Sequence, residues 1–201
     1  MRIFIIFFVL FYASVCHGQE IKLPAPDKQG GAPLMQCLSR RASERSFSGR
    51  LLEFETLSEL LWAAYGVNRI DSGMRTAPSA HNAQEITVYA ALPDGVYRYD
   101  AEKHTLVLYM QEDIRVYCGK QDFVKTAPVV LIYVADISAK DGIEDYIEVD
   151  TGFISQNVYL YCASEGLATV VLGWVDKEAL AVKLKLGPNQ RITYTQPVGT
   201  L

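Results

Sequence analysis

Hydrophobic and polar positions along the chain predict a set of short strands. Ile86–Leu92, residues 96–99 and Thr105–Met110 are apolar-rich runs, and a Pro93-Asp94-Gly95 turn separates the first two. This arrangement is typical of an antiparallel meander. Residues 128–135 are continuously apolar, which predicts a strand buried on both faces. Two further strands are expected near the C-terminus, at residues 168–172 and 191–198.

Helical spacing of apolar residues predicts the helices. The clearest starts at Thr56, where Thr56 and Glu59 have capping-box spacing, and ends at Gly66. Its apolar stripe consists of Leu57, Leu60, Leu61 and Ala64. Further helices are expected at residues 32–41, with Pro33 in the first turn, at 143–166, and at 176–186 before Gly187-Pro188. Strands mixed with unevenly spaced helices place the chain in the α+β class, with a central mainly antiparallel sheet flanked by helices.

The long helix predicted at residues 143–166 contains a glycine. Its main apolar positions are Ile147, Ile154, Val158, Tyr161 and Cys162. Gly152 within it costs about 1 kcal/mol relative to alanine. Close packing of a neighbouring helix at Gly152 is the expected reason.

The first 18 residues have the pattern of a targeting segment. Arg2 precedes an apolar run at residues 3–12, and this run is shorter than the roughly 20 residues that a spanning helix needs. We therefore predict a signal peptide at residues 1–18, cleaved after Gly18, and a periplasmic or secreted mature protein. A buried strand or an uncleaved anchor are the alternatives. A lipoprotein acceptor at Cys16 is less favoured, because Val15 precedes it.

The remaining chain is predicted to form one domain. It has an extended lead-in at residues 19–32 and a single domain at residues 33–201. No second long apolar run follows, so we expect no membrane span in the mature chain. A net charge of -4 argues against a nucleic-acid partner, because such proteins present a basic face. Cys37, Cys118 and Cys162 are predicted to be buried small hydrophobes. The alternative is a single disulfide between two of them.

Common catalytic signatures are absent from the sequence. It contains no Gly-rich dinucleotide fingerprint, no phosphate-binding P-loop, no nucleophile elbow and no HExxH zinc motif. His81 and His104 are the only histidines after residue 18, and they are far apart in sequence. A histidine-rich metal site is therefore not expected.

Three polar segments are candidates for binding chemistry. In the first, residues 40–47 (RRASERSF), guanidinium groups and a serine hydroxyl suit a phosphate. The second, residues 75–84 (RTAPSAHNAQ), carries amides that suit a heterocycle edge. In the third, residues 150–174, Gly173 follows an apolar strand where its N–H would face a ligand. Taken singly, the first segment is also compatible with a solvated helix end, and the second with an ordinary capped loop.

Together these segments resemble one family. The order RRxSxRxF, PSxxNxQ, GxxxQNxxLxAxxxGL and a strand ending in LGW is similar to the nitroreductase-like FMN flavoproteins. The stretch VYRYDAEKHTLVLY and the closing TQPVG resemble the branch that contains the azoline dehydrogenases of peptide maturation. The resemblance covers residues 35–199. It implies the nitroreductase fold, a homodimer and noncovalent FMN at the dimer interface.

The resemblance also implies roles for individual residues. Arg41 and Ser43 would hold the FMN phosphate with help from Arg40, and Arg45 would lie near the N1/O2 edge, where a cation favours reduction. Asn82 would bond the pyrimidine edge. Three residues would shape the loop around it: Pro78, Ser79 and Ala80. A backbone N–H of Leu172 or Gly173 would lie near N5.

The expected activity is ping-pong electron transfer from a reduced donor to a small organic acceptor of nitro, quinone or azoline type. Two features depart from the family pattern. The chain has no basic residue after Val198-Gly199, where relatives contact phosphate, and the predicted export makes a pyridine nucleotide a doubtful donor. The alternative is an exported protein of the same fold that has lost FMN and acts as a binding or structural module.

Overall fold

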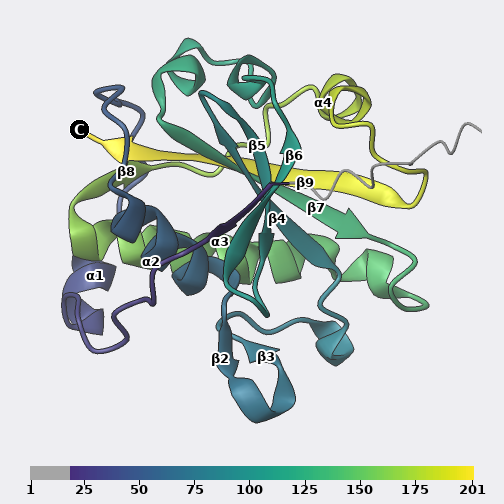
Figure 1. Ribbon diagram of the computed structural model, residues 1–201, viewed down its shortest axis with the longest axis horizontal. Coiled ribbons are helices and arrows are strands. Elements are labelled where there is room, and N and C mark those ends of the chain that lie inside the picture. The colour runs from purple at the N-terminus through teal and green to yellow at the C-terminus, as the bar shows by residue number, and fades with distance from the viewer. Residues whose placement is uncertain (1–18) are drawn as a thin grey trace, which may run out of the picture.

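The computed structural model describes residues 19–201, so the predicted signal peptide at residues 1–18 and its Cys16 lie outside the described residues. Within the described part, the fold is built on a seven-stranded sheet with the order β1-β6-β5-β4-β7-β9-β8, antiparallel throughout (Figure 1). The strands are β1 (Glu20–Lys22), β4 (Ile86–Leu92), β5 (Gly95–Asp100), β6 (Thr105–Met110), β7 (Val129–Asp136), β8 (Leu167–Thr169) and β9 (Gln190–Thr200). The predicted α+β class and mainly antiparallel sheet are confirmed.

Helices cover both faces of this sheet. They are α1 (Leu34–Arg40), α2 (Phe54–Tyr65), α3 (Ile147–Glu165) and α4 (Lys177–Lys183). Figure 1 shows α1, α2 and α3 on one side of the sheet, and α4 on the other side together with the turns between β6 and β7. A small hairpin of β2 (Val67–Arg69) and β3 (Met74–Arg75) projects from the body.

The interior strand β7, between β4 and β9, contributes to two hydrophobic cores. Val129, Leu131 and Tyr133 pack into the core under α2 and α3. Val130 and Ile132 pack into the core under α4 on the opposite face. All five are at most 1% exposed, so the predicted burial of this strand on both faces is confirmed.

The helix starts differ from the predicted ones. Helix α2 begins at Phe54 after Glu53, and no side chain caps it, so the predicted Thr56 capping box is wrong. The apolar stripe of α2 is buried as predicted. The long helix α3 begins at Ile147, because residues Ile143–Asp145 form a separate 3₁₀ turn.

The explanation offered for Gly152 is also wrong. A Cβ built on Gly152 would meet no atom within 4 Å, and the residue is exposed. Within the described chain, no neighbouring helix packs on this position.

The three described cysteines behave as small buried hydrophobes. Cys37, Cys118 and Cys162 are all buried and carry free thiols, which confirms the simpler prediction. Among residues 19–201, no helix is long and apolar enough to cross a membrane.

Candidate functional site

The arginine-rich segment runs in an extended conformation from the end of α1. Arg40 is the last residue of α1, and the backbone N–H of Arg41 closes the helix by donating to the carbonyl of Cys37 (2.8 Å). The chain then lies beside β8, where the backbone N–H of Glu44 donates to the carbonyl of Thr169 (2.9 Å). This path places the predicted phosphate-binding side chains against α3 and β8.

Tyr159 of α3 connects this segment to the sheet. Its hydroxyl lies 3.0 Å from the Ser43 hydroxyl and accepts a hydrogen bond from the backbone N–H of Val171 (2.9 Å). The ring is 7% exposed, and the Arg41 guanidinium lies 5.3 Å from its centroid, a cation–π distance. One buried tyrosine therefore fixes the positions of Ser43 and Arg41.

The positive charge of this segment is not neutralised locally. Arg40, Arg41 and Arg45 form no ion pair with any carboxylate in the part of the chain that the structure describes. Arg45 donates to the backbone carbonyl of Ser43 (3.3 Å), which holds its guanidinium beside the serine. The Arg41 guanidinium and the Ser43 hydroxyl both lie against Tyr159, and a guanidinium with a hydroxyl suits a phosphate dianion.

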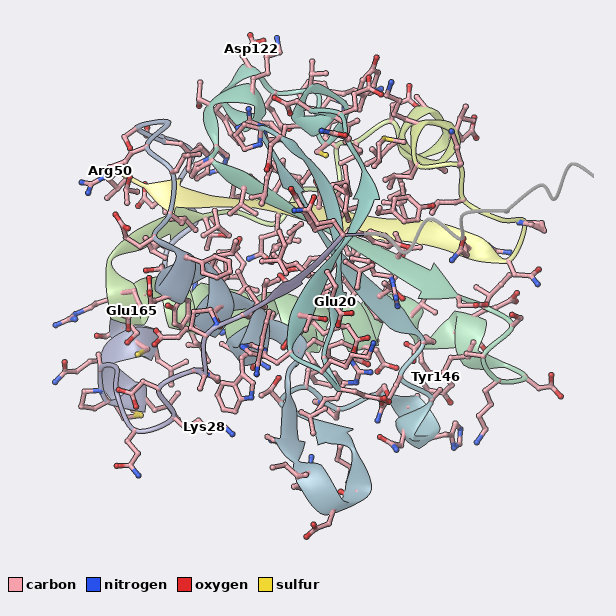
Figure 2. The ribbon with its side chains drawn as sticks, in the orientation of Figure 1. Glu20, Lys28, Arg50, Asp122, Tyr146 and Glu165 are labelled. Atoms are coloured by element: carbon pink, nitrogen blue, oxygen red, sulfur yellow. The ribbon has the colours of Figure 1, made fainter. Side chains whose placement is uncertain are left out.

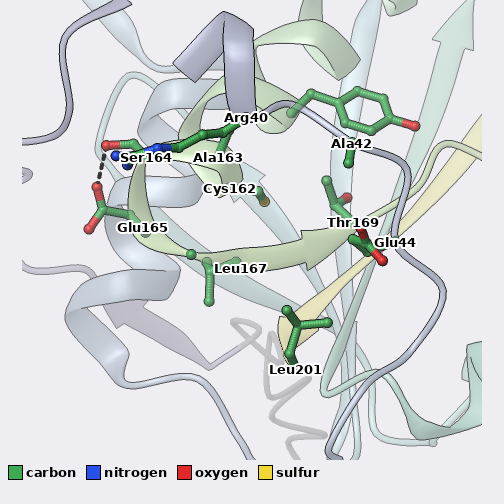
Figure 3. Close-up of a pocket in the computed structure, with 12 residues that line it drawn as sticks. Arg40, Ala42, Glu44, Cys162, Ala163, Ser164, Glu165, Leu167, Thr169 and Leu201 are labelled. Atoms are coloured by element: carbon green, nitrogen blue, oxygen red, sulfur yellow. Dashed lines mark hydrogen bonds between the residues drawn. The ribbon is translucent and has the colours of Figure 1, made fainter. Parts of the chain in front are cut away.

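A cavity of about 480 Å³ is lined by Arg40, Ala42 and Glu44 of this segment and by Tyr159, whereas Arg41, Ser43 and Arg45 do not line it. This volume is within the range of small-molecule sites. Figure 3 shows its lining between the end of α3 and β8, including Arg40, Glu44, Ser164, Glu165, Thr169 and Leu201. The Ser164 hydroxyl donates to Glu165 (2.7 Å) and accepts from the backbone N–H of Ala32 (2.7 Å), so the wall of the cavity is held by hydrogen bonds.

The second predicted segment packs at the other end of α3. The backbone N–H of Ala80 donates to the Asp150 carboxylate (2.8 Å), and the backbone N–H of Gln84 donates to the Ser79 hydroxyl (2.9 Å). Pro78 and Asn82 are exposed. The loop therefore has a fixed backbone and presents the Asn82 side chain to solvent.

The two predicted binding segments do not meet within one chain. The Ser43 segment contacts α3 at Tyr159, and the loop contacts α3 at Asp150, nine residues earlier. At 1.5 Å per residue this separation is about 14 Å along the helix. Figure 2 shows the two ends of α3 on opposite sides of the molecule, marked by Tyr146 and Glu165.

The third predicted segment follows β8. The backbone N–H of Leu172 is already bonded to the carbonyl of Thr195 (2.8 Å). Gly173 is exposed, and its N–H has no hydrogen-bond partner among residues 19–201. Of the two predicted residues, Gly173 is thus the one with a backbone donor available for a ligand. The adjacent Trp174 is 63% exposed.

The family model of nitroreductases matches residues 38–200, nearly all of the described chain. This match covers all three segments of the site. The chain belongs to the nitroreductase family. The family resemblance inferred from the motifs is therefore confirmed, and family and fold together indicate an oxidoreductase.

Several known nitroreductase-type proteins are similar to this chain. A nitroreductase-type protein of Methanocaldococcus jannaschii, MJ1384, is 32% identical over 171 residues, which cover 78% of this chain and 85% of that protein. The crystal structure of a nitroreductase-type protein of Ralstonia eutropha JMP134 superposes with a TM-score of 0.86 and 42% identity, covering 90% of this chain and 89% of that one.

A more distant structure bears on the predicted branch. A chain of the Escherichia coli microcin synthetase McbBCD complex superposes with a TM-score of 0.69 at 16% identity, covering 100% of this chain and 85% of that one. At this identity the likeness shows a shared fold alone. It is compatible with the resemblance to the azoline dehydrogenase branch.

Some residues that hold the candidate site segments in place were not identified from the sequence. Tyr159, Asp150 and Glu85 carry no local motif, because their roles depend on contacts with segments 70 to 116 residues away or on burial. A tyrosine or carboxylate whose partner is distant in sequence cannot be distinguished from an ordinary helix residue. For Asp150, the one available signal was an acidic residue beside Thr151-Gly152 in the predicted long helix.

Proposed function

We propose that this nitroreductase is an FMN-dependent oxidoreductase that passes electrons from a reduced donor to a small organic acceptor. The observation that carries the proposal is the group formed by Arg41, Ser43 and Tyr159, in which unpaired guanidinium charge lies beside an oriented hydroxyl. A bound FMN would supply the redox chemistry, accepting two electrons from the donor and releasing them to the acceptor in two successive half-reactions.

The residues present fit an FMN phosphate. The Arg41 guanidinium is oriented by the Tyr159 ring, and the Ser43 hydroxyl by the Tyr159 hydroxyl. Arg40 lines the neighbouring cavity and adds a second charge. Charge-assisted hydrogen bonds from such groups contribute about 1.5–3 kcal/mol each. In this proposal Arg41 and Ser43 bind the phosphate directly, and Arg40 assists.

Other residues would act on the ring system. Arg45, held beside Ser43, would provide a fixed positive charge at the N1/O2 edge, which stabilises negative charge that develops there. The exposed Asn82 side chain would bond the pyrimidine edge through its amide. The free N–H of Gly173 would donate toward N5. No side-chain nucleophile is needed.

A homodimer would complete this site. Within one chain, the Ser43 segment and the Asn82 loop lie about 14 Å apart along α3. Exposed apolar side chains on α1 and α3, namely Leu34, Met35, Val149 and Phe153, are 45–74% exposed. Where such side chains form one contiguous patch, they mark an interface. We therefore propose that a second copy packs on α3 and brings its Asn82 loop to the Arg41 segment of the first.

The acceptor and the location follow from the same reasoning. Trp174, 63% exposed beside Gly173, offers a flat apolar surface that suits an aromatic nitro compound or a quinone. An azoline remains a further candidate of the same size class. We also propose that the protein acts outside the cytoplasm, on the basis of the sequence of residues 1–18.

Anaerobic spectroscopy of the purified protein reconstituted with FMN tests the redox activity. The bound flavin should be bleached by one equivalent of dithionite and should recover its absorbance when a quinone or nitroaromatic is added. A bound flavin that is reduced but not reoxidised by any such acceptor would contradict the activity. A folded chain that binds no FMN would favour the alternative, a binding or structural module of the same fold.

A further inference from the structure

The loop of residues 79–84 has a strained backbone. His81, Asn82 and Gln84 have φ values of 56°, 54° and 51°, in the left-handed region that non-glycine residues rarely occupy. Strain of this kind persists only when surrounding contacts determine the conformation. The loop therefore depends on the groups that hold it.

Asp150 is the buried group that holds the start of this loop. It is 2% exposed, and its carboxylate accepts the backbone N–H of Ala80 at 2.8 Å. An ionised carboxylate is a stronger acceptor than a neutral one. The loop conformation is thus tied to the charge on Asp150.

Glu85, directly after the loop, is a second buried carboxyl group. It is 3% exposed, and neither of its oxygens has a hydrogen-bond partner within residues 19–201. The loop brings Glu85 toward Asp150, because Asp150 accepts the Ala80 N–H and the N–H of Gln84, the residue before Glu85, donates to Ser79, the residue before Ala80. Two ionised carboxylates repel and cannot bond to each other, whereas a proton on one of them creates a donor.

Among residues 19–201, Glu85 forms no ion pair. Tyr65 of α2 has a buried hydroxyl without a partner among the described residues. The Arg75 guanidinium of β3 donates to Gln84 (2.8 Å) and lies 4.5 Å from the Tyr65 ring centroid. From β7, Asp136 uses its backbone N–H to bond the Glu85 carbonyl (2.9 Å). Across the loop, His81 is exposed and its ring lies 6.1 Å from the ring of Tyr146, which precedes α3.

We propose that Glu85 and Asp150 share one proton and that this proton holds the 79–84 loop in its binding conformation. With Glu85 protonated, its hydroxyl donates to Asp150, which remains ionised and accepts the Ala80 N–H. When Glu85 loses that proton to water, two buried negative charges face each other, and the strained loop is released. Asp150 and Glu85 are positioning residues in this scheme, because neither is proposed to touch a ligand.

The titration of Glu85 is consistent with this scheme. Burial, and then the charge and hydrogen bond of Asp150, raise the pKa of Glu85 to about 7. The pair would therefore change its charge within the physiological range of pH.

The effect on ligand binding rests on the proposed FMN function, because the loop carries Asn82.

The primary test of the shared proton does not need FMN. In the flavin-free protein, NMR would follow the Ala80 amide resonance between pH 5 and pH 9. The Ala80 resonance should shift with a midpoint close to 7 in the native protein. It should not show this step in Glu85→Gln, whose amide keeps a donor toward Asp150. Glu178→Gln, an exposed site on α4, should titrate like the native protein.

Two results would overturn the inference. One is an Ala80 resonance that does not change across this range in the native protein, and the other is the same midpoint in Glu85→Gln. If Glu85→Gln does not fold, an NMR pH titration of the side-chain carboxyl carbon of Glu85 in the native protein replaces it. A titration midpoint near the ordinary glutamate pKa of about 4.3 would contradict the shared proton.

FMN binding supplies the second measurement. If only the protonated pair is competent, the apparent Kd should rise about tenfold per pH unit above 7, and Glu85→Gln should remove this dependence. A Kd that is constant from pH 6 to pH 9 in the native protein would contradict the coupling to binding. Failure to bind FMN at any pH would contradict the proposed function, while the NMR titration would still decide the shared proton.

Discussion

The Ser43 hydroxyl lies 3.0 Å from the Tyr159 hydroxyl, which joins the segment after α1 to the middle of α3. The same tyrosine oxygen accepts the Val171 N–H (2.9 Å), just before Leu172 and Gly173. A single side chain therefore sets the relative position of the proposed phosphate-binding group and of the backbone donor at Gly173. This relationship makes Tyr159 the most informative position for mutation.

Replacing Tyr159 by Phe should weaken both stability and FMN binding. The Val171 N–H loses its partner, and an unsatisfied buried group costs about 1–3 kcal/mol, whereas the exposed Ser43 hydroxyl can bond to water. We expect the free energy of unfolding in urea to fall by about 1–2 kcal/mol. Tyr146→Phe, at an exposed position, is the control. Equal stabilities of the two variants would show that the hydroxyl network is unimportant.

Replacing Arg41 by Ala should weaken FMN binding and leave riboflavin binding unchanged, because riboflavin has no phosphate. The loss of charge-assisted bonds of about 1.5–3 kcal/mol corresponds to a rise in Kd of roughly 10- to 150-fold. Fluorescence titration with FMN and with riboflavin measures the Kd of each flavin. The matched control is Arg50→Ala, an arginine three residues beyond the 40–47 segment whose side chain is 75% exposed. An equal loss for both flavins would contradict the phosphate assignment.

The half-buried His104 should make the free energy of unfolding depend on pH. His104 Nε2 lies 2.7 Å from the Ser58 hydroxyl and 3.0 Å from the Pro24 carbonyl, and Nδ1 lies 2.8 Å from the Tyr99 hydroxyl. Burial lowers the pKa of His104 below its ordinary value. The folded state therefore favours the neutral His104 ring, and protonation of this ring shifts the equilibrium toward the unfolded state.

The free energy of unfolding should accordingly be fully retained above about pH 6.5 and should fall as the pH drops below this value toward the folded-state pKa. His104→Asn, which tolerates the positive φ of 54° at this position, should lose this part of the pH dependence. His81→Asn, at an exposed site, should retain it. Urea denaturation between pH 5 and pH 7.5 measures the free energy of unfolding of the native protein and of both variants. The same pH profile in His104→Asn as in the native protein would disprove the role of His104.

The buried thiols should be unreactive in the folded protein. Burial raises the pKa of Cys118 to about 12 and moves the pKa of Cys162 well above its ordinary value. At pH 8 the thiolate fraction of Cys118 should be roughly a thousandfold below that of an unfolded cysteine. Iodoacetamide labelling read by peptide mass spectrometry should therefore modify both residues only after denaturation. Rapid labelling of the native protein would refute this.

The sequence predicted strands best where a pattern of apolar residues extends over six or more positions. The strands β4 and β6 have the predicted bounds, and the continuous apolar run became β7, because burial on two faces requires apolar residues throughout. The strands β1, β2 and β3 have two or three residues each, too few to show a period. Their pairing depends on contacts such as Ile21 with Leu106, which no local pattern encodes.

The site was predictable only in part, for a related reason. Arg41 and Ser43 lie in a local motif, but the side chain that orients them, Tyr159, is 116 residues from Ser43. The expected cap at Thr56 failed because helix α2 begins two residues earlier, at Phe54. The packing expected at Gly152 failed because this residue is exposed in the described chain.

Equilibrium titration of the purified protein with FMN, followed by flavin fluorescence, tests the central claim most directly. We expect saturable quenching with one FMN per chain and a protein that migrates as a dimer. A folded protein with a normal far-ultraviolet spectrum that shows no saturable binding would contradict the assignment of Arg41, Ser43 and Tyr159 to a flavin phosphate site.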